Sequence, residues 1–450
     1  MRTNAGDRGV AALAARACDE CLDKREQHSI RQTSAYLGTA LCRALATTTT
    51  MVTTMTTTTM MRDRMTRRAV GPVGGVEDDD EREKGFEKTR LVRVFAVSDV
   101  HVDHDVNAAW VRGLSSTSGR QGKDCGVLRC CVVAGDVSED LETLTRTLAD
   151  FQRGFDEVFY TFGNHELWLN AGDEGKGDSK EKIQRIFDAC EEIGVRTKPT
   201  KVGDDVWIVP VHAYHHREFD TEPDVEEPIP PVEQIMNDFR FSKWRDMDDG
   251  TDQVARYCDS LNDDGWDEFL AEVKLDDRVV SFSHFVPRIE LLPEKRMLFY
   301  PNLPKASGSN FLRARVDALK ARVDDGNMTH VFGHTHFGWN TEIDGVRYIQ
   351  AALATPREWS KRPRSLEIGN FNSNTSTEPL CVYDDGSFPE DQAMWSAYYA
   401  KHERTPDYVE LAPHAREFVH RRWGAGRHRG RNRERDEETA PLPGVTGKIA

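Results

Sequence analysis

The chain has 450 residues, a formal net charge of −16 and 38% hydrophobic residues. This length holds one large or two ordinary domains with a sizeable core, and the acidic balance disfavours a broad nucleic-acid-binding surface, which needs clustered Lys and Arg. The nine cysteines are scattered and odd in number, as is usual for reduced thiols inside cells. Because no apolar run approaches the ~18–20 residues of a membrane span, the sequence predicts a soluble intracellular protein.

Residues 1–88 lack the apolar periodicity of a folded domain. A Thr- and Met-rich tract at 47–61 precedes several arginines, and between Leu41 and Val76 the only acid is Asp63. This composition is typical of an organelle transit peptide, and a plain disordered leader or a misassigned start fits it equally well. A transit peptide predicts a chloroplast or mitochondrial location, whereas a plain leader or a misassigned start predicts a cytoplasmic one.

From residue 89 onward, five strand-like apolar runs end in side chains that bind metal ions. The runs and the residues after them are 94–97 with Asp99 and His101, 128–133 with Asp136, 158–162 with Asn164 and His165, 279–283 with His284, and 328–332 with His334 and His336. Ligands bind beyond the carboxyl ends of strands in open α/β sheets. Side chains two apart on an extended segment point the same way, so we expect Asp99 and His101 to reach one ion together.

The remaining sequence predicts an α/β domain over residues 89–420. Apolar periodicity indicates helices near 107–114, 141–151, 181–193, 266–273 and 312–323, and further strands at 206–211, 346–352 and 380–384. A basic loop is expected between the last two strands, with Arg357, Lys361, Arg362 and Arg364. Residues 421–450 are rich in Arg, Gly and charge without apolar periodicity, which predicts a disordered basic tail.

Two segments, 219–252 and 288–310, interrupt the alternation with prolines, aromatic residues and charges. Segments of this kind beside a catalytic edge are interpreted as caps over the substrate that supply no metal ligand. In the second cap, Arg288, Lys295 and Arg296 are candidates for binding substrate phosphate or are solvated loop charges. Two alternatives remain for the histidines after the 206–211 strand, His212, His215 and His216: they contact substrate, or they lie in a surface loop. We expect His104 outside the ligand set.

The ligand types can be interpreted together as a dinuclear centre. Two divalent cations ~3.5–4 Å apart need a bridging carboxylate with flanking oxygen and imidazole ligands, and such a centre polarises a phosphoryl oxygen and generates hydroxide near neutral pH. Asp136 is the natural bridge. Asp99, His101 and one of the two late histidines would complete one ion, and Asn164, His284 and the other late histidine would complete the second.

In this order the blocks Asp99-x-His101, Gly135-Asp136, Gly163-Asn164-His165-Glu166, His284 and Gly333-His334-Thr335-His336 resemble the calcineurin-like metallophosphoesterase superfamily. The resemblance implies a four-layer α/β/β/α sandwich with two mixed sheets, and two divalent ions that are Mn, Fe, Zn or Mg. It assigns Asp99, His101, Asp136 and His336 to one ion, and Asp136, Asn164, His284 and His334 to the other. His165 would assist the leaving group without binding either ion. Residues 283–288 and 293–304 are similar to an uncharacterised plant and green-algal subgroup of the superfamily.

Two departures narrow the resemblance. Val-Ser-Glu-Asp-Leu follows Asp136 and Phe162 precedes Gly163, so the phosphate-holding arginines of Ser/Thr protein phosphatases are absent. Glu139 stands where purple acid phosphatases carry a tyrosine ligand, which argues against an iron–tyrosinate centre. The remaining hypotheses are a hydrolase of phosphomonoesters or phosphodiesters, a nuclease aided by the basic tail, and a catalytically inactive scaffold, which the intact ligand set disfavours.

Overall fold

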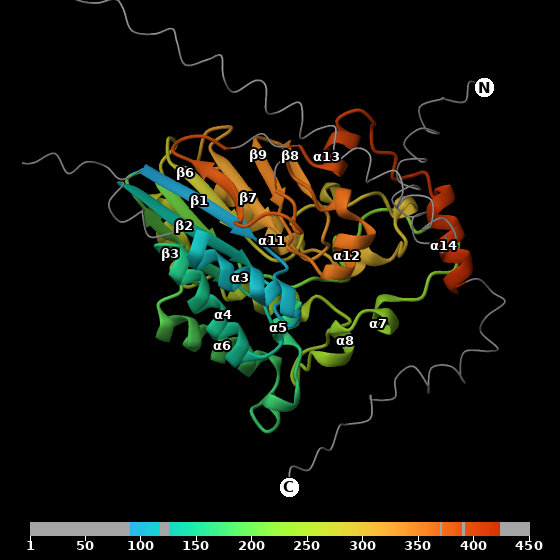
Figure 1. Cartoon of the computed structure of the whole chain (residues 1–450). Coiled ribbons are helices and arrows are strands. Elements are labelled where there is room, and N and C mark those ends of the chain that lie inside the picture. Colours follow the sequence, from blue (N-terminus) through green and yellow to red (C-terminus); the bar gives the residue numbers. More distant parts are fainter. Residues whose placement is uncertain (1–90, 118–125, 370, 389–391, 424–450) are drawn as a thin grey trace, which may run out of the picture. The chain divides into compact units, whose positions relative to one another are not determined.

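The computed structural model describes residues 91–117, 126–369, 371–388 and 392–423 (Figure 1). Their strands form two mixed sheets. The first has the order β10 (Leu380–Asp384), β1 (Leu91–Val97), β2 (Val127–Ala134) and β3 (Glu157–Thr161). The second has the order β4 (Thr200–Val202), β5 (Val206–Pro210), β6 (Arg278–Phe282), β7 (Met328–Phe332), β9 (Val346–Gln350) and β8 (Trp339–Ile343). In each sheet the central strands are parallel. The outer strand β10 of the first sheet and both outer strands of the second, β4 and β8, are antiparallel to their neighbours.

The two sheets pack face to face, with helices on their outer faces. Alternate residues of β1 and β2, such as Val94 and Val132, share one buried cluster with Ile208, Phe282 and Val331 of the second sheet. Helices α3 (Asp105–Thr117), α4 (Leu141–Gly154) and α6 (Ser179–Ile193) cover the first sheet (Figure 1). Helices α9 (Gln253–Ser260), α10 (Trp266–Glu272) and α11 (Asn310–Lys320) cover the second. The expected four-layer α/β/β/α sandwich is confirmed.

Local sequence accounts for the helices that follow the ligand-bearing turns. The N-cap Asp140 accepts a hydrogen bond from the Thr143 amide before α4, and Asp178 with Glu181 forms a capping box before α6. Helix α6 ends at Gly194, which adopts φ +74°. Each helix buries one apolar stripe against the sheet, so the strand ends and their polar residues are fixed from both sides.

The region after β9 differs from the expected basic loop. Residues 356–361 form helix α12 (Pro356–Lys361), and a 3-10 turn (Pro363–Ser365) follows. Thr355 and Glu358 form a capping box, with Pro356 in the first turn, which is a strong local signal for a helix start. The loop interpretation was therefore wrong, because it weighed the charges of this segment and overlooked its cap.

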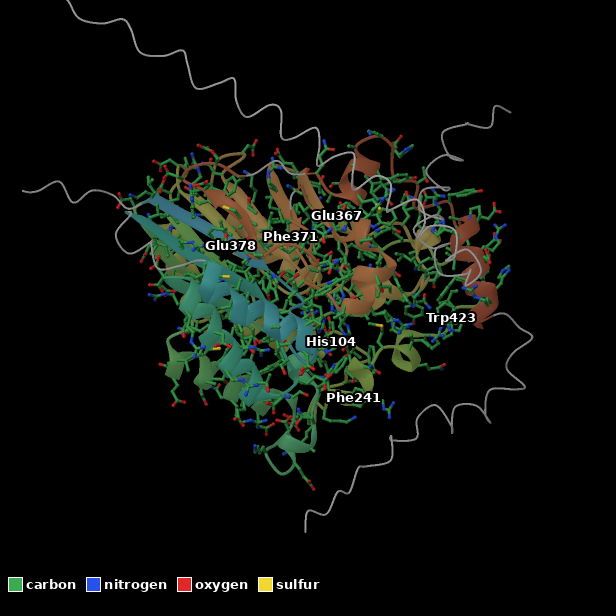
Figure 2. The ribbon with its side chains drawn as sticks, viewed as in Figure 1. His104, Phe241, Glu367, Phe371, Glu378 and Trp423 are labelled. Carbon is green, nitrogen blue, oxygen red and sulfur yellow. The ribbon has the colours of Figure 1, made fainter. Side chains whose placement is uncertain are left out.

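The two insertions consist of short helices and turns. The first contains α7 (Val232–Ile235) and α8 (Asp238–Phe241), and the second contains three 3-10 turns, the last at Leu303–Ala306. Helices α13 (Met394–Tyr399) and α14 (Pro413–Trp423) complete the described chain. Ala415 and Val419 of helix α14 form a small buried cluster with the preceding Leu411, against which Val225 and Ile229 of the first insertion pack. Trp423 ends the helix three residues inside the expected tail (Figure 2).

The predicted leader at 1–88 and the tail from 424 onward lie outside the described residues. Within the part of the chain that the structure describes, no helix combines the length and apolarity needed to cross a bilayer.

Candidate metal centre

The metal-type side chains follow the carboxyl ends of β1, β2, β3, β6 and β7, where the two sheets meet. Ser98, just beyond β1, bridges to the second sheet: its amide donates to the Ala351 carbonyl at 3.1 Å, and its own carbonyl accepts from Leu353 at 2.9 Å. Beyond β2, the His101 amide donates to the Asp136 carbonyl at 2.8 Å. Backbone bonds therefore hold the ends of both sheets at one edge.

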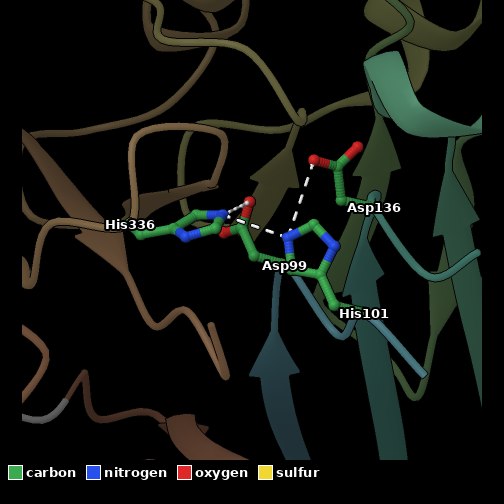
Figure 3. Close-up of side chains that lie close together, drawn as sticks. All are labelled: Asp99, His101, Asp136 and His336. Carbon is green, nitrogen blue, oxygen red and sulfur yellow. Dashed lines mark hydrogen bonds and ion pairs between the residues drawn. The ribbon is translucent and has the colours of Figure 1, made fainter. Parts of the chain in front are cut away.

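Four ligand-type residues form the first group: Asp99, His101, Asp136 and His336. One ligand atom from each lies within 4.8 Å of the others, and Figure 3 shows the four side chains converging. His336 Nε2 lies 3.2 Å from Asp99 Oδ1 and 3.1 Å from His101 Nε2, and His101 Nε2 lies 4.0 Å from Asp136 Oδ2. This group could hold one divalent cation.

Three further residues form a second group beside Asp136: Asn164, His284 and His334. Asn164 Oδ1 lies 3.1 Å from His284 Nε2 and 3.0 Å from His334 Nδ1. His284 Nε2 also lies 3.3 Å from Asp136 Oδ2, so Asp136 faces both groups. All seven residues proposed from the sequence are thus brought together, in the two sets that the motif resemblance implied.

Three histidines of the two groups have one ring nitrogen hydrogen-bonded to an oxygen outside the centre. His284 Nδ1 donates to the Ala134 carbonyl at 2.9 Å, His334 Nε2 to the Ala306 carbonyl at 2.8 Å, and His336 Nδ1 faces Glu358 Oε2 at 2.8 Å. The other nitrogen of each ring faces the ligand cluster. This is the usual support of metal-binding imidazoles, so these residues fit a divalent cation.

The backbone at the ligands is locally strained. Among the described residues, eight that are not glycine have positive φ, and Asp99, His101, Asp136, His334 and His336 are five of them, with φ from 44° to 75°. Such conformations cost of order 1–3 kcal/mol each and cluster at functional sites. They also correct one expectation: β1 ends at Val97, so Asp99 and His101 meet through a tight turn and not through extended geometry.

Two glycines allow the turns to approach each other. Gly135 has φ +78°, and a Cβ there would lie 2.7 Å from the Gly163 nitrogen and from His284 Nδ1. A Cβ at Gly163 would collide with the Asp136 carboxylate and lie 2.8 Å from its amide nitrogen. The glycines before the ligand motifs are therefore required by close packing as well as by backbone conformation.

Charges in the centre compensate one another. Burial disfavours ionisation of Asp136, yet His284 and His165 hold its pKa well below its usual value. Burial lowers the pKa of His284, but Asp136 outweighs this and raises it to about 9. Burial also lowers the pKa of His336, but the negative charges of Glu358 and Asp99 outweigh this and raise it to about 10. Metal binding requires neutral imidazoles and would displace these protons.

His165 lies next to the ligands but is more open than they are, with a side chain 26% exposed. Its Nε2 is 3.9 Å from Asp136 Oδ2 and its Nδ1 is 3.6 Å from Glu139 Oε1. The ring packs against that of Trp168, with centroids 3.8 Å apart and planes tilted by 32°. Burial lowers its pKa, but Asp136 and Glu139 raise it overall. A partly open imidazole beside the centre is able to hydrogen-bond a substrate oxygen.

Two carboxylates behind the ligands were missed by the sequence analysis. Glu166, quoted above only as part of a motif, is fully buried and accepts from the amides of Asp136, Ser138 and Gly163 at 3.0, 3.1 and 2.6 Å. Glu358 of α12 accepts from His336 and from the Thr355 amide at 3.0 Å. The capping box of α12 was a readable signal for Glu358.

Two groups come from the insertions, which were expected to cover the substrate and to supply no metal ligand. The Ala306 carbonyl accepts from His334, as described above. Asp238 of α8 is 1% exposed and accepts from Asn164 Nδ2 at 2.7 Å. The insertions thus supply no metal-type ligand, yet they contact residues that do.

The additional histidines differ in their environments. His212, His215 and His216 are buried, so the surface-loop alternative is wrong. His212 is held by Thr161 and the Thr197 carbonyl, whereas His215 lies 3.1 Å from Asp238 Oδ2 and its ring stacks 6.4 Å from that of His334. His104 is exposed and outside the ligand set, as expected (Figure 2).

The basic residues of the second insertion are engaged in ion pairs. Arg288 is 5% exposed and pairs with Glu290 and with Asp344, which lies in the turn before β9, away from the carboxyl edge. Lys295 is 3% exposed and lies 2.7 Å from the buried Asp220. Arg296 likewise pairs with the buried Glu294 at 3.0 Å. The expectation that these residues bind substrate phosphate or are solvated loop charges is therefore wrong, because their charges are used in ion pairs within the protein.

No family model matches the sequence. The [acyl-carrier-protein] phosphodiesterase PptH of Mycobacterium tuberculosis is 24% identical over 281 residues, covering 60% of this chain and 80% of the relative. The crystal structure of that phosphopantetheinyl hydrolase covers 62% of this chain and 95% of its own, with 20% identity and a TM-score of 0.47. The crystal structure of a putative 5'-nucleotidase of Staphylococcus aureus covers 58% of this chain and 48% of its own, with 12% identity and a TM-score of 0.30.

The sequence likeness agrees with what the ligand motifs imply. The relative in the sequence comparison is a phosphodiesterase, and the five motif blocks resemble metallophosphoesterases. The plant and green-algal subgroup remains a prediction. The similarity to one phosphodiesterase and the motif resemblance to metallophosphoesterases thus agree with each other.

Proposed function

We propose that the chain is a phosphoric ester hydrolase that works with two divalent metal ions. The observation that carries the proposal is the convergence of seven metal-type side chains from five strand ends, with Asp136 facing both groups. Asp99, His101, Asp136 and His336 would hold one ion, and Asp136, Asn164, His284 and His334 the other. Such ions supply Lewis-acid activation of a phosphoryl group and of the attacking water.

The residues around the ions have separable tasks in this proposal. Asp136 provides the shared negative charge that keeps two cations close together. His165, which contacts Asp136 and Glu139 but has an exposed edge, donates a hydrogen bond or a proton to the departing oxygen. Trp168 limits the movement of the His165 ring by packing against it. The intact centre supports a catalytic role over that of an inactive scaffold.

The substrate class is proposed by analogy with the relative. Its name describes a phosphodiesterase of acyl-carrier protein, and its structure is described as that of a phosphopantetheinyl hydrolase. We therefore propose a phosphodiester as substrate, and a phosphopantetheinyl group on an acyl-carrier protein as the first one to test. The metal identity is taken from the motif resemblance, with Mn²⁺ as the first ion to supply.

The proposal is tested with the full chain, bis-(p-nitrophenyl) phosphate and Mn²⁺. We expect metal-dependent release of nitrophenolate that is abolished by chelation. Asp136→Ala removes the shared carboxylate, so we expect both metal affinity and activity to fall. The loss of affinity should exceed the ~10–100-fold that is typical when a group hydrogen-bonded to a metal ligand is removed. Metal content and rate are measured in the same preparation.

Asp140→Ala is the matched control, because Asp140 lies in the same loop but caps α4 through the Thr143 amide. Its loss costs about 1 kcal/mol of stability and should leave metal content unchanged. Full metal content and rate in Asp136→Ala would refute the dinuclear centre. Equal losses in both variants would show that the loop, and not the shared carboxylate, is responsible.

A further inference from the structure

The first insertion reaches the candidate metal centre through one buried carboxylate, Asp238. Its Oδ1 accepts hydrogen bonds from Asn164 Nδ2 at 2.7 Å and Trp168 Nε1 at 2.8 Å. Its Oδ2 lies 3.1 Å from His215 Nε2. At 1% exposure, this carboxylate is surrounded by donors from two loops of the sheet edge, although it belongs to a segment outside the sheets.

The bond to Asn164 decides which way the side-chain amide faces. The amide oxygen and nitrogen have nearly the same shape, and a rotation of 180° exchanges them. Because a carboxylate oxygen only accepts, the Asn164 nitrogen must face Asp238. Its oxygen then faces His284 Nε2 at 3.1 Å and His334 Nδ1 at 3.0 Å. The opposite orientation would direct N–H groups at a cation and exclude it.

We propose that Asp238 is a positioning residue, which orients Asn164 so that its oxygen can bind a cation between Asn164, His284 and His334. Occupancy of this second position therefore depends on the insertion. The inference rests on the proposed function, which it deepens. The same carboxylate oxygen fixes Trp168, whose ring packs against His165, so the insertion also steadies the residue proposed to act on the leaving group.

The chain offers a matched carboxylate remote from the centre. Asp277 is 2% exposed and accepts from Trp207 Nε1 at 2.9 Å and from the Lys274 amide at 3.0 Å. It precedes β6, whereas His284 follows that strand. Replacing Asp277 thus removes a buried carboxylate and an indole acceptor, as replacing Asp238 does, but without touching a ligand-type residue.

The test counts Mn²⁺ ions bound per full-length chain by equilibrium dialysis of metal-free protein. We expect two ions for the wild type and for Asp277→Ala. Asp238→Ala should retain one tight ion, with the affinity of the second position weakened by about 10–100-fold. Asp238→Asn should bind two, because its amide oxygen still accepts from Asn164 and its nitrogen can donate to the other tautomer of His215.

Circular dichroism of the metal-free proteins establishes folding, and Asp238→Ser, whose hydroxyl is too short to reach the Asn164 amide, replaces Asp238→Ala if that variant does not fold. Two ions bound with wild-type affinity in Asp238→Ala overturn the inference and leave the proposed function standing. Equal weakening in Asp277→Ala also overturns it, since the effect would then be one of general stability. A wild type that binds no Mn²⁺ overturns the proposed function together with the inference.

Discussion

The two halves of the candidate metal centre are held in place by different parts of the chain. In the half around Asp99 and His336, support comes from the sheet edge and from α12: the His334 amide donates to Asp99 Oδ1 at 2.8 Å, and Glu358 accepts from His336. In the half around Asn164, support comes largely from the insertions, through Asp238 and the Ala306 carbonyl. In both halves the ligand residues follow strands, but the groups that hold the ligands in place come from different parts of the chain.

This difference changes how the insertions are interpreted. Cap segments raise specificity through contacts to the non-reacting part of a substrate, and the sequence predicted that role alone. Because Asp238 contacts Asn164 and Ala306 contacts His334, a change in either insertion would reach the ligands as well as the substrate. Only the half supported by the sheet edge is insulated from such changes.

The largest effect is expected at a residue that belongs to neither half. His165→Asn should lower the turnover of bis-(p-nitrophenyl) phosphate by roughly 10²–10⁴-fold, because it removes the acid proposed to assist the leaving group. Metal content should stay at the wild-type level in both halves. Rate and metal are measured on one preparation, and a parallel fall in both would make His165 a ligand.

A change at Glu358 should weaken the half that Asp238 does not support. Glu358→Ala removes the oxygen that fixes the His336 ring, so Mn²⁺ affinity at one of the two positions should fall by about 10–100-fold. Dialysis measures this affinity. Thr355→Val is the control, because Thr355 shares the cap of α12 with Glu358 but does not contact His336. Similar losses in both variants would assign the effect to the helix cap.

The smallest effect on activity is expected in the second insertion. Lys295→Met leaves the buried Asp220 without its ion-pair partner, which should destabilise the protein by about 3–5 kcal/mol. The rate of the remaining folded enzyme should stay within a few-fold of wild type. Chemical unfolding is measured against Lys305→Met, which loses a pair to the mostly exposed Asp224, worth about 0–1 kcal/mol. Equal stability in the two variants would contradict this.

Local sequence patterns predicted the strands, the helices and the convergence of the ligands, and the resemblance of the ligand motifs to a known superfamily implied the sandwich. Period-two and period-3.6 apolar patterns identify strands and helices, and parallel strands bring their carboxyl ends to a common edge. Gly135 and Gly163 marked turns that need close packing. These features are visible in sequence because each depends on neighbours a few residues away.

Tertiary structure decided which polar groups stand behind those ligands. Segment 219–252 contains many acids, and no spacing distinguishes Asp238 from the others; folding of the insertion onto Asn164 and Trp168 buries this one. Lys295 likewise has the composition of a phosphate-binding residue and instead pairs with Asp220. The sequence by itself determined the strand ends and their ligands through local periodicity. The partners of buried charges depend on residues distant in the chain, so only the packed structure determines them.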